Sequence, residues 1–187
     1  MYVNSGAIFR AAEDFVDRYK NVAIAGFNYD YFARKRKLPA FYLNARVYSQ
    51  SLILNEIPYQ WRGVYNDDTD LCLRVLKDGW CTILFNAFLG KKMQTMTVKG
   101  GNTPIYEKDE NQFDGRLEMA RSLQEQHPDL VGITWKFGRW QHQVNYKPFR
   151  RRNKLKKKKG INIPKGINNY GMVLQKKVNR RWVNINE

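Results

Sequence analysis

The sequence has few residues of several kinds, and each shortage excludes a class of protein. It holds two cysteines, Cys72 and Cys81, which are too few for a disulfide scaffold or a four-ligand cysteine zinc site. No run of about 18 apolar residues occurs, which excludes a membrane-spanning helix. The first 15 residues also lack the basic-then-apolar order of a signal peptide. We therefore expect a reduced, cytoplasmic setting and no membrane partner.

Acidic residues are scarce as well, because 17 Asp and Glu face 33 Lys and Arg, a formal charge of +16. Residues 147–187 hold 14 basic residues and one acidic residue, whereas residues 1–146 hold 19 and 16. Nine of the 14 residues in 147–160 are basic, so self-repulsion predicts a segment that is extended and unpacked when free. Nucleic acid is the favoured partner because its phosphates release counterions when cations bind. A solvated tail and a membrane surface are the alternatives, and no amphipathic helix or lipidation motif supports the membrane. The residues expected to contact phosphates are Arg150, Arg151, Arg152, Lys154, Lys156, Lys157, Lys158 and Lys159.

The sequence does contain enough apolar residues, 43% of the total, to build a packed core. Apolar spacing, acidic starts and glycine stops predict helices over residues 8–20, 67–78 and 115–126. Short apolar runs predict strands over residues 22–27, 80–86, 93–98 and 131–137. Residues 29–39 are expected to form a loop, and residues 41–54 extended structure interrupted near Gln50. Strands that alternate with helices predict an α/β layered fold, a domain over 1–149, and a basic tail over 150–187 with a terminal hairpin over 172–185.

A cluster of acidic residues is the first candidate site. Asp67, Asp68 and Asp70 lie within four positions at the expected start of a helix. Such close carboxylates repel one another unless a helix end, a cation or a proton-accepting role offsets their charge. One interpretation is a helix cap, which needs only one of the three. The other is a catalytic cluster in which Asp67 or Asp68 acts as a general base toward a hydroxyl acceptor.

Three other segments combine residue types that bind ligands. Residues 99–104 place two glycines after an expected strand, but an ordinary turn explains them better, and their spacing matches no phosphate-binding fingerprint. Residues 135–142 interleave aromatic and basic residues, which suits stacking on bases or sugars. His142 is either a metal ligand or a hydrogen-bonded side chain. Trp61 and Arg62 are either an exposed pair that holds a flat ring or a phosphate, or a buried Trp beside a surface Arg.

Several motifs together resemble a known family. WRGVYNDDTDLCLRVLKDGWCTILFNAF, MTVKGGNT and WKFGRWQHQVNYKPF are similar to the TET-associated glycosyltransferase family, over roughly residues 22–150. The resemblance implies a GT-A-like enzyme that transfers a sugar from a nucleotide-sugar to hydroxymethylated pyrimidines in DNA. It also implies a divalent metal, Mg²⁺ or Mn²⁺, that offsets the charge of the diphosphate leaving group.

The resemblance also implies roles for individual residues. Residues 66–70, Asn-Asp-Asp-Thr-Asp, resemble the family's Asn-Glu-Asp-Thr-Asp, so Asp68 takes the position of the catalytic base, together with Asp67 and Asp70. Asp67 stands where the family usually has a Glu, which is one methylene longer. His142 matches the family's Trp-Gln-His and would complete a metal site. The expected substrate-binding residues are Trp61, Arg62, Lys99, Gly100, Gly101, Asn102 and Trp140.

The chain departs from this pattern at its start. GT-A enzymes begin with a Rossmann-like half that ends in an Asp-x-Asp metal motif, and no such motif precedes Val22. The expected fold is therefore the C-terminal portion of a GT-A-like fold, with a mixed sheet and a basic tail. A separately encoded N-terminal half is an expected partner. The alternative functions are a non-catalytic DNA-binding remnant and a scaffold half that docks onto such a partner.

Overall fold

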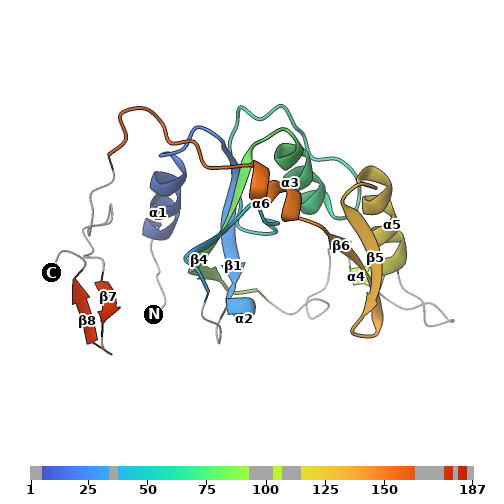
Figure 1. Ribbon diagram of the computed structural model, residues 1–187. Coiled ribbons are helices and arrows are strands. Elements are labelled where there is room, and N and C mark those ends of the chain that lie inside the picture. Colours follow the sequence, from blue (N-terminus) through green and yellow to red (C-terminus); the bar gives the residue numbers. More distant parts are fainter. Residues whose placement is uncertain are drawn as a thin grey trace. The chain divides into compact units, whose positions relative to one another are not determined.

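The chain divides into two compact units, which are described separately. A computed structural model describes residues 6–33, 38–92, 103–106, 115–162, 175–178 and 181–184 (Figure 1). The larger unit is Val22–Lys154, and the smaller unit joins Met1–Asn21 to Leu155–Glu187. The domain boundary expected between residues 149 and 150 falls inside helix α6 (Lys147–Arg152), within the larger unit.

A mixed four-stranded sheet organises the larger unit. Its strands are β2 (Phe41–Leu43), β4 (Cys81–Gly90), β1 (Val22–Tyr29) and β3 (Leu52–Ile53), in that order across the sheet. β1 runs parallel to β4, whereas β2 and β3 are antiparallel to their neighbours. Seven of the eight residues of β1 are buried, as a nearly continuous apolar run predicts for a central strand. The expected α/β fold with a mixed sheet is confirmed.

Helix α3 (Asp67–Lys77) joins two hydrophobic clusters. Leu71, Cys72 and Val75 pack with residues of the sheet, while Leu73 and Leu76 pack with residues of the segments that follow it. Gly79 adopts a positive φ of 87° directly after the helix, which confirms the predicted glycine stop. Because α3 is fixed from both sides, the side chains at its first turn have a rigid support. Both cysteines are buried, and burial raises the pKa of the Cys72 thiol to about 12.

The second layer of this unit consists of a helix and a hairpin. Helix α5 (Arg116–Gln126) packs against strands β5 (Val131–Lys136) and β6 (Arg139–Val144), which pair antiparallel (Figure 1). The predicted helix and the predicted first strand are confirmed. The second strand was not predicted, because Arg139–Val144 mixes aromatic, basic and polar residues without a clear alternation.

The basic run begins with structured residues, which corrects the expected extended and unpacked segment. Residues Lys147–Arg152 form helix α6, and Phe149 is buried in the core. The Asn153 side-chain amide donates to the carbonyl oxygens of Leu76 and Trp80 at 2.8 and 2.6 Å. The Asn44 amide in turn donates to the carbonyl oxygens of Phe149 and Asn153 at 3.0 and 2.8 Å. One buried aromatic ring and these buried amides offset the charge repulsion that the composition predicted.

The smaller unit holds the rest of the basic run by backbone pairing. After helix α1 (Ala7–Val16), the Lys20 N–H donates to the Lys156 carbonyl at 2.9 Å, and the Lys158 N–H donates to the Arg18 carbonyl at 2.8 Å. Strands β7 (Gln175–Val178) and β8 (Arg181–Asn184) pair antiparallel, which confirms the predicted terminal hairpin.

Other local predictions had mixed outcomes. The expected loop 29–39 contains the short helix α2 (Asp30–Ala33), and the interruption near Gln50 is confirmed by its positive φ of 48°. A further short helix, α4, covers Thr103–Tyr106. The strand predicted over residues 93–98 lies outside the described residues. None of the described helices is long and apolar enough to cross a membrane.

Candidate functional site

The three carboxylates of the acidic cluster point into three different environments. The Asp67 side chain is exposed, the Asp68 side chain is 20% exposed, and Asp70 is fully buried. Asn66 precedes them with a positive φ of 55°, and its amide donates to the Met119 carbonyl at 2.8 Å instead of capping α3. The three carboxylates therefore do not form one acidic patch. The helix points them in different directions, and Asp68 and Asp70 bind different cationic side chains.

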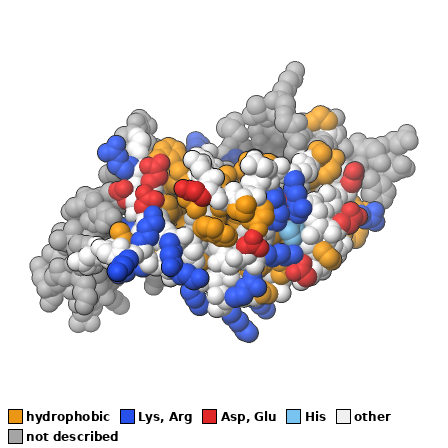
Figure 2. All heavy atoms as spheres, turned by 90° about the horizontal axis from the view of Figure 1, so that it is seen from above, with side chains coloured by type: hydrophobic (Ala, Val, Ile, Leu, Met, Phe, Trp, Pro, Cys, Tyr) orange, Lys and Arg blue, Asp and Glu red, His pale blue; other side chains and the backbone are white. Residues whose placement is uncertain are grey.

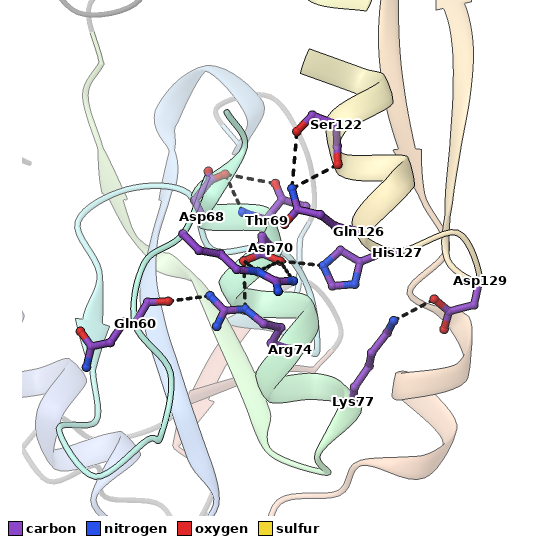
Figure 3. Close-up of polar contacts among 11 residues, drawn as sticks. Gln60, Asp68, Thr69, Asp70, Arg74, Lys77, Ser122, Gln126, His127 and Asp129 are labelled. Atoms are coloured by element: carbon purple, nitrogen blue, oxygen red, sulfur yellow. Dashed lines mark hydrogen bonds and ion pairs between the residues drawn. The ribbon is translucent and has the colours of Figure 1, made fainter. Parts of the chain in front are cut away.

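Asp70 is held in the interior by three cationic or ionisable side chains (Figure 3). Its carboxylate accepts from Arg62 Nη2 at 2.8 Å, Arg74 Nε at 2.9 Å and His127 Nε2 at 2.8 Å. Burial by itself raises the pKa of Asp70, but hydrogen bonds from Arg62 and His127 and the charge of Arg74 outweigh burial, so the net pKa lies below its usual range. Burial likewise lowers the pKa of His127 against the effect of Asp70. This arrangement anchors the first turn of α3 to its surroundings.

Asp68 faces a different arginine. Its Oδ2 accepts from Arg46 Nη2 at 2.7 Å and from Arg46 Nε at 3.1 Å, while its Oδ1 accepts from the Thr69 backbone N–H at 2.6 Å. The Thr69 hydroxyl donates to the same Oδ1 at 3.1 Å, so these four bonds use the roughly four acceptor positions of the carboxylate. A further donor therefore has to displace one of them, and the Thr69 hydroxyl is the one that is able to rotate away. The pairing with Arg46 fixes the orientation of the Asp68 side chain.

A pocket of about 1020 Å³ lies in the larger unit beside this ion pair. Arg46 lines it, and Asp68 is paired with Arg46 but is not itself a lining residue. Among the described lining residues there is one carboxylate, Asp30. Four cations line the pocket: Arg46, Lys92, Arg116 and Arg139. Five aromatic rings line it as well: Tyr29, Tyr31, Phe32, Tyr106 and Trp140. Figure 2 shows basic side chains interspersed with hydrophobic and a few acidic ones on one face of the surface.

His142 lines the pocket as a neutral side chain. Burial first, and then the charge of Arg46, lower its pKa to about 4, although Asp68 acts in the opposite direction. A neutral imidazole is able to bind a metal. However, no group of three or more His, Cys, Asp or Glu suited to a metal ion occurs among the residues that the structure describes. The Asp68 carboxylate, whose charge acts on the pKa of His142, is paired with Arg46. The described side chains therefore do not fit the expected Mg²⁺ or Mn²⁺ site.

The structure separates the remaining predicted substrate-binding residues. Trp140 lines the pocket, where it makes an edge contact with Trp135 at 5.2 Å between ring centroids. Trp61 is 53% exposed and is not a lining residue, and Arg62 forms an ion pair with Asp70. The other four, Lys99, Gly100, Gly101 and Asn102, lie outside the described residues.

Sequence reasoning missed most of the pocket lining. Tyr29–Phe32 carried a usable signal, because three aromatic residues cluster at the end of a buried strand. Arg46 carried none, since it is a single cation between two extended segments with no motif around it. Lys92 and Arg116 lie in different segments, and only the fold brings them together.

The predicted phosphate-contacting residues do not form one uniform set. Arg150 and Arg151 are exposed on α6. Arg152 Nη2 instead donates to the Leu76 and Lys77 carbonyl oxygens at 3.1 and 2.9 Å, where the end of α3 leaves acceptors without helical partners. Arg152 therefore stabilises the C-terminal end of α3. The five lysines of the run, Lys154, Lys156, Lys157, Lys158 and Lys159, are exposed.

The α/β fold therefore carries a large pocket that is lined by cations and aromatic rings. Such a lining suits an anionic ligand that contains rings. The model of the TET-associated glycosyltransferase family matches residues 2–101, more than half of the 187 residues. The chain belongs to this family. The match includes the acidic cluster, Arg46 and Lys99–Gly101, whereas Asn102, Trp140 and His142 lie beyond it. No curated protein and no solved structure matches the chain.

Proposed function

We propose that the chain acts as, or forms part of, a glycosyltransferase that moves a sugar from a nucleotide-sugar to a hydroxymethylpyrimidine base in DNA. Membership of the family supports the reaction class. The single observation that carries the proposal is the pocket, which is lined by four cations and five aromatic rings and in which one of those cations, Arg46, pairs with Asp68. Cations suit the diphosphate of a nucleotide-sugar and the phosphates of DNA, and aromatic rings suit bases and sugars.

Asp68 is the proposed general base. As the hydroxymethyl oxygen attacks the anomeric carbon, the bond from that carbon to the diphosphate breaks and the hydroxyl proton passes to an Asp68 oxygen. Arg46 orients the carboxylate with two hydrogen bonds, and Arg46 also borders the pocket where the negative charge of the leaving group develops. Because the described side chains do not fit a metal site, the lining arginines and lysine compensate the charge of the leaving group in this proposal.

The GT-A relationship and a separately encoded nucleotide-binding half belong to the same proposal. They are tested by incubating the chain, alone and together with a polypeptide that carries an Asp-x-Asp nucleotide-binding half, with radiolabelled nucleotide-sugars. The acceptors are hydroxymethylated DNA and unmodified DNA of the same sequence. We expect sugar incorporation into the hydroxymethylated DNA only, with little or none by the chain alone and clear incorporation when the second polypeptide is present. Robust incorporation by the chain alone would contradict the separately encoded half. Incorporation in neither arm, or into both DNAs alike, would contradict the proposal.

The exposed lysines of the smaller unit are expected to bind phosphates without reading sequence. Replacing Lys157 and Lys158 with glutamine should reduce the slope of log K against log salt for duplex DNA by about 0.9 for each phosphate that is no longer neutralised, hence by about 1.8 for two. The backbone bonds of these residues to residues 18 and 19 do not involve the side chains, so the fold is retained.

The matched control for this measurement removes two other exposed cations, Arg10 and Arg121. Fluorescence anisotropy of a labelled duplex across a salt series gives both slopes. An equal change in the two double variants would show that net charge alone matters, and an unchanged slope in the Lys157 and Lys158 variant would show that these residues do not touch DNA.

A further inference from the structure

The tip of the β5–β6 hairpin has an unusual residue in a demanding position. Phe137 and Gly138 form its two-residue turn, with φ values of 54° and 68°. Two positive φ values are what a type I′ turn requires, and Asn, Asp or Gly are strongly preferred there. A bulky residue such as Phe in this conformation is a genuine outlier. The local backbone therefore gives no reason for Phe at this position.

The exposure of Phe137 is equally unfavourable for folding. Its side chain is 88% exposed, and Trp135 on the same hairpin is 58% exposed. An isolated exposed aromatic residue is common, but Phe137 stands at the end of a hairpin that carries two further aromatic residues, of which Trp140 lines the pocket. Backbone outliers of this kind persist mainly at functional sites.

Charge at the hairpin tip points to the nature of the partner. Lys136 and Arg139 are directly opposite each other in the strand register, on either side of the Phe137–Gly138 turn. Like charges directly opposite in a β-ladder are destabilising. An anionic partner would remove this repulsion. Arg139 also lines the pocket, so the positive charge continues from the tip into the pocket.

The geometry points to the β5–β6 hairpin as a base-stacking finger: Phe137 stacks on an unpaired base of acceptor DNA while Lys136 and Arg139 contact its flanking phosphates. This inference rests on the proposed function for its partner, because it takes DNA as the acceptor. Aromatic rings stack on bases of any sequence, and cations beside the ring hold the backbone. Strand β6 runs from the finger into the pocket, with Trp140 and His142 along its path. A base held at the tip is thereby kept next to the pocket.

The test is the Phe137→Asn variant of the full chain, since Asn suits a type I′ turn and leaves the fold intact. Binding is measured by fluorescence anisotropy with two labelled single strands of equal length, one with normal bases and one with abasic sites throughout. We expect Phe137→Asn to bind the normal strand about five- to 150-fold more weakly than the wild type, which is the range for one stacked base. On the abasic strand, the variant and the wild type should bind with the same affinity. Phe137→Trp, which keeps an aromatic ring at this position, should bind the normal strand about as tightly as the wild type.

Val64→Asn is the matched control, because Val64 is also an apolar residue with an exposed side chain, 75% of it accessible, and it does not line the pocket. It should bind both strands as the wild type does. Equal binding of the normal strand by the wild type and Phe137→Asn overturns the inference. Equal loss on normal and abasic strands, or a loss confined to an RNA strand of the same sequence, also overturns it.

The outcomes for the hairpin and for the proposed reaction are separable. If the base-dependent loss occurs but no sugar is transferred in the incorporation assay, the finger is supported and the proposed reaction is contradicted. If sugar is transferred while Phe137→Asn binds like the wild type, only the finger is contradicted. If the wild type binds neither strand, DNA as the partner is contradicted for both.

Discussion

Replacing Asp70 with alanine should lower the free energy of unfolding by about 3–5 kcal/mol, the usual cost of removing one partner from a buried ion pair. The Asp70 side chain is 1% exposed, and its partners His127 and Arg74 are 2% and 15% exposed. Without the carboxylate, the Arg74 charge and the His127 N–H lose their partner in the interior. Arg62 contributes less to this cost because its side chain is 48% exposed.

Urea unfolding followed by tryptophan fluorescence measures this change, and Asp67→Ala is the matched control. Asp67 is an exposed carboxylate in the same helical turn, so its loss should change the unfolding free energy by less than about 0.5 kcal/mol. If Asp70→Ala were as mild as Asp67→Ala, the buried cluster would not be what anchors the first turn of α3.

The same cluster predicts how stability depends on pH. The pKa of Asp70 is lowered in the folded state, so its stabilising contribution is present above the unfolded value of about 3.9 and is lost as the pH falls through the folded value. The pKa values of His127 and His142 are also lowered, and the unfolded chain therefore binds protons first as the pH falls below about 6.5. Wild-type stability should fall from about pH 6.5 downward. The stability difference between wild type and Asp70→Ala should shrink only below about pH 3.9.

The sequence predicted those elements whose local pattern and tertiary role agree. β1 is apolar over its first six residues, which are buried, and α3 has acids at its start and a glycine after its end. Prediction from the sequence was wrong where tertiary contacts outweigh the local composition. Nine basic residues in 14 predicted an unpacked run over residues 147–160, but Phe149 and Asn153 fix its first half in the core. Two residues with buried side chains outweighed the surrounding charge.

The sequence predicted the acidic motif of the candidate site, but it did not predict which side chains bind each carboxylate. The acidic cluster is conspicuous in the sequence, but no local rule states which carboxylate turns inward. That choice depends on Arg62, Arg74 and His127 meeting at Asp70, and on Arg46 meeting Asp68, and the last of these contacts joins segments 22 residues apart. The structure thereby divides one motif into an anchor, Asp70, and a side chain poised beside the pocket, Asp68.

This division gives the sharpest prediction for activity. Asp68→Asn should reduce sugar transfer to hydroxymethylated DNA by about 10²- to 10⁴-fold, the range for loss of a general base, while DNA binding is unchanged. Asn keeps the size of Asp and one acceptor oxygen, so Arg46 retains a hydrogen bond. Asp67→Asn, which changes the exposed neighbour, should retain most of the activity. Initial rates of incorporation of radiolabelled sugar measure both variants.

The pH dependence of the rate separates a base from a residue that only positions Arg46. A general base must be deprotonated to act, so the wild-type rate should fall on acidification, and this acidic limb should be absent from the residual activity of Asp68→Asn. If Asp68 acted only by orienting Arg46, its charge would still be needed, so Asp68→Asn would lose the acidic limb as well. In that case Arg46→Lys, which loses the two-point contact to the carboxylate, would reproduce the Asp68→Asn defect. A loss of the acidic limb in Asp68→Asn, together with a retained limb in Arg46→Lys, identifies the carboxylate itself as the proton acceptor.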